Sequence, residues 1–202
     1  LCVSMERIYV HSGVYDQFVD RFVARIGALR MNAGIGWDAD FGSLISAEQL
    51  ARVSAAVDDA VAKGATVLTG GHALPEVGPF YYAPTVLTGV TPDMACYGSE
   101  TFGPVVAIEK VDTDEQAITL ANASPYGLNA SVLVGDDDRG AQIARRLTTG
   151  SVNVNEAYEA TFGSTRAPMG GRGLSGLGRR NGEHGLTRFT EEQTIAIQRG
   201  IG

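Results

Sequence analysis

A carboxylate and an aromatic ring stand two residues apart in the segment 99–104, Ser-Glu-Thr-Phe-Gly-Pro, directly before a β-branched run. Gly103 can adopt backbone angles closed to other residues, and Pro104 fixes its own φ at about −65°. We therefore expect a rigid turn that holds Glu100 and Phe102 at the start of a strand. This pair could bind a polar ring such as a ribose, with a flat group stacked alongside. The alternative is a solvated glutamate and a core phenylalanine.

The two cysteines, Cys2 and Cys96, are the strongest candidate nucleophiles of the chain. A thiolate forms covalent adducts readily when nearby donors or a base lower the pKa of the thiol. The alternative for each is a small buried hydrophobic residue. The residue types alone do not choose between the two cysteines. Two cysteines are too few for a disulfide framework, which favours a reducing, cytoplasmic location.

The composition is typical of a globular protein, and the length is enough for one large domain. The chain has 202 residues, of which 44% are hydrophobic and 19% charged. Its formal charge of −7 argues against nucleic acid or an anionic membrane as partner, because both need a basic surface. No apolar run approaches the roughly 20 residues that span a bilayer. The three histidines are far from one another in the sequence. None of them stands at metal-ligand spacing with a Cys, Asp or Glu, so we expect no metal site.

The segment 171–176, Gly-Arg-Gly-Leu-Ser-Gly, matches the dinucleotide-binding pattern GxGxxG. That pattern binds phosphate only between a strand and the start of a helix. Here Pro168 and Met169 precede it and the pair Arg179 and Arg180 follows, so neither flank fits. We expect a wound loop.

Strand and helix patterns alternate along the chain, which predicts an α/β fold with a largely parallel sheet and helices on both faces. The Tyr81–Val90 stretch is also β-prone, but Pro84 argues against a regular central strand. A last alternating run, Thr194–Gln198, is expected to pair with a partner subunit. The expected strands are 7–10, 66–69, 105–111, 129–134 and 151–154, and the expected helices are 14–26, 46–63, 113–123 and 137–147.

Three segments, in this order and at these separations, resemble the aldehyde dehydrogenase family. The opening Leu1-Cys2 resembles the family's nucleophile loop, and Glu100–Pro104 matches its Glu-x-Phe-Gly-Pro box. The stretch 168–191 matches its C-terminal signature. The resemblance covers essentially the whole chain and implies the Rossmann-like catalytic domain at 1–190 with an oligomerisation strand at 191–202. It also implies a homodimer or homotetramer formed through that strand.

The resemblance implies a role for each matched residue. Cys2 would attack an aldehyde to give a thiohemiacetal, hydride would pass to NAD or NADP, and water would hydrolyse the thioester. Glu100 would hold the hydroxyls of the nicotinamide ribose, with Phe102 packed beside them. Phe162 would line the aldehyde channel.

Met169, Arg180 and the run 152–158 resemble the actinobacterial branch of succinate-semialdehyde dehydrogenases within the family. The arginine that such an enzyme uses for the substrate carboxylate would lie upstream. Ser164 and Arg166 are local candidates for that contact, on the basis of their position in the loop.

The chain opens with Leu1 and without a methionine, so we expect it to be the C-terminal part of a larger enzyme. In the family the cofactor domain, the general-base glutamate and the oxyanion asparagine all precede the nucleophile. We therefore expect no aldehyde oxidation by the 202-residue chain alone. The alternative is a catalytically inert member of the family with a structural or interaction role.

Overall fold

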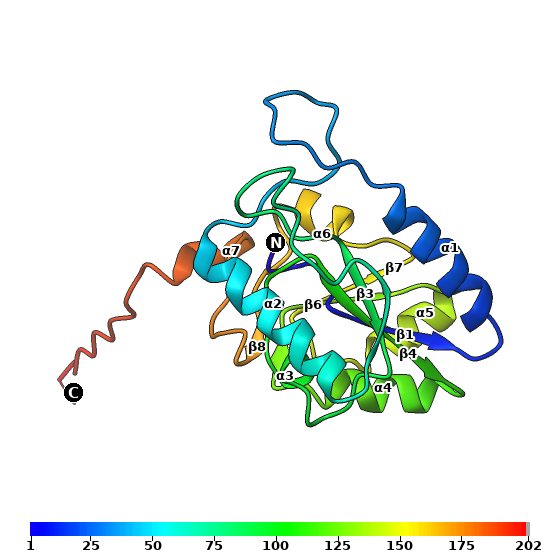
Figure 1. The fold of residues 1–202 in the computed structure, drawn as a ribbon. Coiled ribbons are helices and arrows are strands. Elements are labelled where there is room, and N and C mark those ends of the chain that lie inside the picture. The colour runs from blue at the N-terminus through cyan, green and yellow to red at the C-terminus, as the bar shows by residue number, and fades with distance from the viewer. Residues whose placement is uncertain (201–202) are drawn as a thin grey trace. The chain divides into compact units, whose positions relative to one another are not determined.

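The computed structural model describes residues 1–200, which form two compact units (Figure 1). The first unit ends at Ser124 and the second begins at Pro125. Each unit has its own strands and helices.

The first unit is built on a four-stranded sheet with the strand order β1-β4-β3-β2. Strands β1 (Arg7–His11), β4 (Val105–Val111) and β3 (Thr85–Thr88) run parallel, and β2 (Thr66–Thr69) pairs antiparallel with β3. The expected α/β fold with a largely parallel sheet is confirmed.

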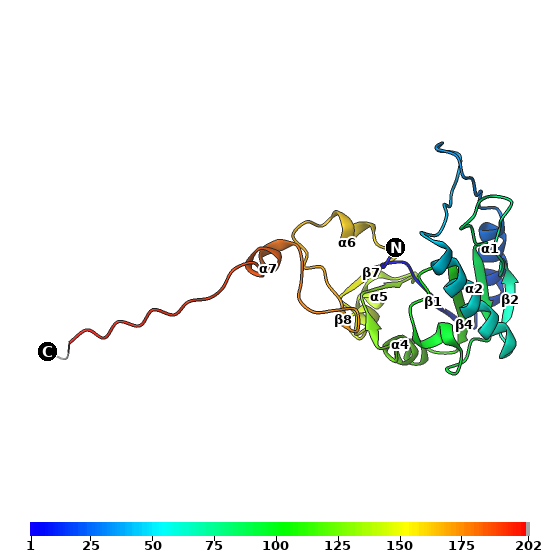
Figure 2. The ribbon, with the colours of Figure 1, turned by 60° about the vertical axis from the view of Figure 1, so that its left-hand side comes forward.

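Two amphipathic helices cover opposite faces of this sheet, as the two views of the ribbon show (Figures 1 and 2). Helix α1 (Tyr15–Gly27) packs its apolar side on Val86, whereas α2 (Ala47–Ala62) packs on Leu87. Successive strand residues point to opposite faces, so the two helices lie on either side of the sheet. Two separate hydrophobic clusters form the core of this unit.

Helix α4 (Asp114–Asn122) lies beside β1 on the same face as α2. The guanidinium of Arg7 donates to the carbonyl of Ala121, and the hydroxyl of Tyr9 donates to that of Leu120. Thr113 begins α4, because its hydroxyl accepts the N–H of the residue three positions on.

The spacing of apolar residues along α2 predicts that Leu50, Val53, Val57, Ala60 and Val61 all face inward. Val53 and Val57 are buried, but Val61 is 47% exposed. At 100° per residue, Val61 lies about 80° around the helix from Val53, at the rim of the apolar stripe. The expected inward position of Val61 is wrong.

The expectation that Pro84 rules out a regular central strand is also wrong. Strand β3 begins at Thr85, immediately after the proline, and lies between β4 and β2. Its first ladder bond runs from the N–H of Thr85 to the carbonyl of Pro104 at 2.7 Å. Pro84 therefore precedes the ladder and does not remove one of its donors.

The second unit holds two small sheets. Strands β6 (Asn129–Val132) and β7 (Ser151–Val154) pair in parallel, and β5 (Tyr126–Gly127) pairs antiparallel with β8 (Arg172–Gly173). Helix α5 (Asp137–Ala144) packs on β6 and β7. It ends three residues earlier than expected.

The remaining helices are short: α3 (Ala95–Gly98) in the first unit, and α6 (Glu159–Gly163) and α7 (Gly182–Thr187) in the second. Where the GxGxxG pattern would need a helix start, the structure has β8 followed by a turn.

Residues 191–200 are exposed and have no regular secondary structure in the single chain. A strand that pairs with a second subunit needs that subunit, so the oligomerisation strand stays a prediction. Residues 201 and 202 of the expected 191–202 segment lie outside the described residues.

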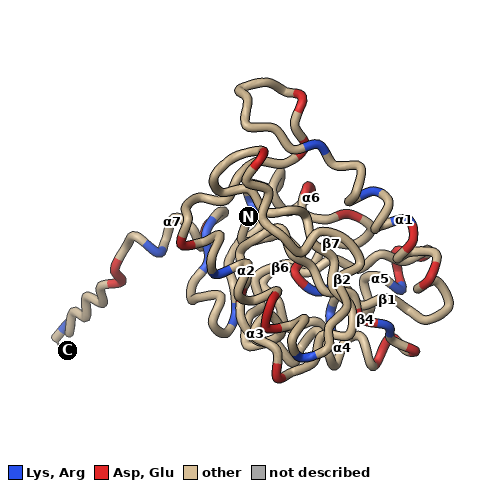
Figure 3. Tube along the Cα trace, in the orientation of Figure 1, with Lys and Arg blue, Asp and Glu red and all other residues tan. Residues whose placement is uncertain are grey.

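Acidic and basic residues both lie along helix α1 (Figure 3). They are Asp16, Asp20, Arg21 and Arg25. Across residues 1–200, none of the helices is both long and apolar enough to cross a bilayer.

Candidate active site

The two segments with candidate chemistry lie at one end of two neighbouring strands. Strand β1 pairs in parallel with β4, with Arg7 beside Ala107. Cys2 stands five residues before β1, and Glu100 stands five residues before β4. Because parallel strands start at the same sheet edge, the cysteine loop and the Glu100 turn both belong to the amino-terminal edge of this sheet.

Glu6 joins these two segments directly. Its carboxylate accepts the N–H of Thr101 on one oxygen and the N–H of Phe102 on the other, each at 3.0 Å. Its own carbonyl accepts the N–H of Ala107 at 2.9 Å, which extends the pairing of β1 with β4. A single residue four positions after Cys2 therefore fixes the backbone that carries Glu100 and Phe102.

Gln49 approaches the same backbone from α2. Its side-chain Nε2 donates to the carbonyls of Thr101 and Phe102, both at 3.0 Å. The Gln49 side chain is buried, and its Oε1 accepts from Arg52 at 3.4 Å. This orientation leaves both amide hydrogens free for the two carbonyls.

Ser46 and Gln49 stand at the spacing that predicts a reciprocal capping box at the start of α2, and only half of this box forms. The hydroxyl of Ser46 accepts the N–H of Gln49 at 3.2 Å, as expected. The Gln49 side chain does not return to the cap, because it is bound to the Glu100 turn. Glu6 and Gln49 were both missed as site residues, since their partners are main-chain atoms distant in sequence.

The turn itself has an unusual backbone. Phe102 adopts a φ of 52°, in the left-handed region that bulky residues rarely enter. A Cβ on Gly103 would lie 2.5 Å from Cγ2 of Val53, so only glycine fits there. As a result Phe102 is 51% exposed and Glu100 is exposed. The alternative of a core phenylalanine does not apply in this chain.

The structure distinguishes the two candidate nucleophiles, Cys2 and Cys96, by their exposure. Cys2 is exposed, in a turn closed by the N–H of Ser4 donating to the carbonyl of Leu1 at 2.9 Å. Cys96 is half-buried on α3 and lines a small cavity with Tyr9 and Glu109. Burial raises the pKa of the Cys96 thiol above its usual value. Cys2 is therefore the accessible thiol.

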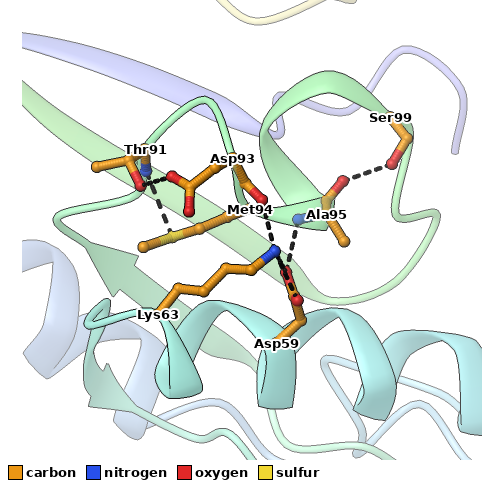
Figure 4. A network of polar contacts seen from close by, with 7 residues as sticks. All are labelled: Asp59, Lys63, Thr91, Asp93, Met94, Ala95 and Ser99. Atoms are coloured by element: carbon orange, nitrogen blue, oxygen red, sulfur yellow. Dashed lines mark hydrogen bonds and ion pairs between the residues drawn. The ribbon is translucent and has the colours of Figure 1, made fainter.

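A polar network fixes α3 just before the Glu100 turn (Figure 4). Asp59 of α2 accepts the N–H of Ala95 at 2.8 Å and pairs with Lys63 at 2.8 Å. Lys63 also donates to the carbonyl of Asp93 at 2.5 Å. The hydrogen bond from Lys63, and then that from Ala95, hold the pKa of Asp59 below its usual value. Asp59 thus satisfies the first N–H of α3.

The three candidate substrate residues belong to the second unit. Phe162 lies on α6, 81% exposed, with its ring tilted against that of Tyr158 at 6.4 Å between centroids. The N–H of Ser164 donates to the carbonyl of Ala160 at 3.1 Å, and Arg166 is exposed. Their role toward a substrate stays a prediction.

Asn153 holds α6 and the residues directly before it in place. This buried side chain donates to the carbonyl of Ala157 at 2.8 Å and accepts from the hydroxyl of Thr161 at 2.5 Å. No pattern in the sequence indicates this role, because a single asparagine within a strand belongs to no periodic pattern.

The first unit is thus an α/β structure in which the exposed thiol of Cys2 and the exposed carboxylate of Glu100 both precede neighbouring parallel strands, β1 and β4. Comparison of the sequence with protein families identifies the class of protein: the aldehyde dehydrogenase family matches residues 1–195. The chain belongs to this family.

The individual relatives agree with this assignment. A Mycolicibacterium smegmatis protein, provisionally named succinate-semialdehyde dehydrogenase of the NADP(+) type, is 52% identical over 98% of this chain and 38% of its own length. The crystal structure of succinate-semialdehyde dehydrogenase from Burkholderia pseudomallei has a TM-score of 0.84 and 36% identity, over 92% of this chain and 38% of that one.

A Bacillus cereus aldehyde dehydrogenase, solved as its NAD+ complex, has a TM-score of 0.85 and 36% identity, over 92% of this chain and 37% of that one. The chain therefore spans about 38% of the length of the curated relative that it matches.

Proposed function

We propose that this chain is the catalytic part of an NAD(P)-dependent aldehyde dehydrogenase that oxidises succinic semialdehyde to the carboxylic acid. The observation that carries the proposal is the link through Glu6, which fixes the Glu100 turn to the segment that follows the exposed thiol of Cys2. Membership of the aldehyde dehydrogenase family supports the reaction class.

Cys2 is the proposed nucleophile. Its thiolate adds to the aldehyde carbon and forms a C–S bond, which gives a thiohemiacetal with the charge on oxygen. The N–H of Cys2 donates to that oxygen. Loss of hydride from the same carbon gives a thioester, and water then cleaves the C–S bond to release the acid and the thiol.

Glu100 and Phe102 are the proposed cofactor-binding residues. Their chemistry fits a nicotinamide riboside, since an exposed carboxylate accepts from two hydroxyls and a half-exposed ring packs against a flat group. A bound nicotinamide supplies the hydride acceptor. NADP(+) in the name of the M. smegmatis relative and NAD+ in the B. cereus complex support this cofactor class.

The proposed substrate contacts come from the loop at α6. The exposed ring of Phe162 lines the aldehyde channel, and Ser164 with Arg166 binds the distal carboxylate. The hydrogen bonds of Asn153 to Ala157 and Thr161 fix the start of this segment. The names of the M. smegmatis and B. pseudomallei relatives support succinic semialdehyde as substrate.

The test compares succinic semialdehyde with an uncharged aldehyde of equal length, in the full-length protein that contains this chain. We expect kcat/KM to favour succinic semialdehyde by at least tenfold, and Arg166→Gln to remove part of that preference. Cys2→Ser should abolish turnover with both aldehydes.

Equal rates with both aldehydes would refute the substrate, and full activity of Cys2→Ser would refute the mechanism. We expect no turnover by the isolated 202-residue chain, because it spans only 38% of its relative's length.

A further inference from the structure

We propose that Glu6 and Gln49 form a clamp on the main chain of Thr101 and Phe102, and that this clamp sets the position of Glu100 for the cofactor. The clamp is defined as these two side chains and the four main-chain groups that they bind. The inference rests on the proposed function, because it assigns two positioning residues to the proposed cofactor site.

The clamp provides a hydrogen-bond partner for the N–H and the carbonyl of both Thr101 and Phe102. The two oxygens of Glu6 accept the two N–H groups, and the two hydrogens on Nε2 of Gln49 go to the two carbonyls, with all four distances at 3.0 Å. A carboxylate only accepts and an amide nitrogen only donates, so each side chain matches one kind of main-chain group.

The backbone at this position needs such support. Thr101 is buried, and strand β4 begins only at Val105. The hydrogen bonds of the sheet therefore hold neither Thr101 nor Phe102. Phe102 has a φ of 52°, a strained left-handed conformation that persists only where the surroundings enforce it. The clamp supplies that constraint from two elements, the loop after Cys2 and helix α2.

The consequence falls on the neighbour of the clamped residues. Glu100 itself is exposed and precedes Thr101 directly. A fixed peptide plane at Thr101 therefore narrows the positions that the Glu100 carboxylate can take before cofactor binds. Loss of the clamp should weaken cofactor binding and leave the aldehyde contacts of the second unit unchanged.

Two variants of the full-length protein test the clamp through KM and kcat for both substrates. Glu6→Gln keeps the shape but turns one acceptor into a donor that faces an N–H. We expect a rise of about tenfold in KM for the nicotinamide cofactor, the size of one lost hydrogen bond to a charged group. Gln49→Glu places a carboxylate against two carbonyls and should raise that KM at least as much. KM for the aldehyde should stay within twofold.

Matched controls make the same charge changes at exposed positions of the first unit. Glu48→Gln on α2 and Gln17→Glu on α1 should leave cofactor KM within twofold. A lower kcat with unchanged cofactor KM in both clamp variants would mean a merely structural role and would overturn the inference.

Amide hydrogen exchange measured by NMR gives a second readout that needs no activity. The N–H groups of Thr101 and Phe102 should exchange at least tenfold faster in Glu6→Gln, while the β4 amides stay protected. Unchanged exchange at these two amides overturns the clamp. If the wild-type protein oxidises no aldehyde, the proposed function fails, and the exchange experiment still decides whether the clamp exists.

Discussion

Cys2 and Cys96 carry the same thiol in different surroundings, and this difference decides which one can react. Cys2 is exposed in the loop before β1, whereas Cys96 faces the small cavity beside Tyr9 and Glu109. Desolvation is the main cause that raises the Cys96 pKa, and it raises the pKa of Tyr9 to about 12 and that of Glu109 above its usual value as well. The cavity therefore favours neutral forms of all three groups.

We expect iodoacetamide at pH 7.5 to alkylate Cys2 at least tenfold faster than Cys96. Because burial raises the pKa of the Cys96 thiol, less of it is thiolate at a given pH, and its alkylation should become appreciable only at a higher pH than for an ordinary thiol. Peptide mass spectrometry of the full-length protein over a pH series measures both rates, with Cys96→Ser as control. Equal, slow labelling of both would favour an inert member of the family.

At this scale the sequence indicated which residue types matter but not all their partners. Glu100 and Phe102 could be singled out because Gly103 and Pro104 mark a turn by residue type alone. Glu6 and Gln49 could not be singled out, since the main-chain atoms of Thr101 that they bind lie 95 and 52 residues further along the chain, respectively. Every residue has main-chain N–H or carbonyl groups, so a bond to them cannot be predicted from the type of the partner residue.

Helix α2 connects the core of the first unit to the Glu100 turn. Its buried side packs on Leu87, its first turn carries Gln49, and Asp59 near its other end binds the N–H of Ala95. A change in the start of α2 should therefore affect the turn, whereas the same change in α4 should not.

Ser46→Ala and Thr113→Ala test this difference as a matched pair of N-cap variants. Each removes one hydroxyl that accepts an N–H at 3.2 Å, which costs about 1 kcal/mol. Exchange of the first-turn amides should speed up about fivefold in the helix that loses its cap. Only Ser46→Ala should also raise cofactor KM in the full-length protein. An equal rise in cofactor KM for Thr113→Ala would contradict the link.

The regular elements were predictable where a local signal exists. Strand β4 has the expected bounds, because a β-branched run follows a Gly-Pro turn, and both N-caps of α2 and α4 were visible as serine and threonine. Helix α3 was missed because its cap, Asp59, comes from another element. Strands β5 and β8 have two residues each and exist through mutual pairing, which no short-range pattern encodes.

On the scale of the whole molecule, family membership follows from motifs spread over the chain, while the assembly does not follow from one chain. Residues 191–200 are exposed, and Ile195 and Ile197 are 76% and 77% exposed. Two β-branched side chains at alternate positions suit a strand that pairs with a second copy.

Deletion of residues 191–202 from the full-length protein should convert a homodimer or homotetramer into smaller species. Light scattering after size exclusion measures the mass, and Thr194→Ala serves as a control that keeps the segment. We expect the mass of the deletion variant to fall at least twofold at micromolar concentration. An unchanged mass would rule out this segment as the main contact between subunits.

The pairing of β1 with β4 also has a consequence for synthesis of the chain on the ribosome. Val10 pairs with Lys110, and Glu6 binds Thr101 and Phe102, so the partners of the cysteine segment are translated roughly a hundred residues after it. Contacts this far apart form late. A nascent chain that has not reached Ser99 thus exposes its thiol segment without the turn that carries the proposed cofactor-binding residues. Arrest of translation before that point should yield a product that has Cys2 exposed and lacks the proposed cofactor-binding residues Glu100 and Phe102.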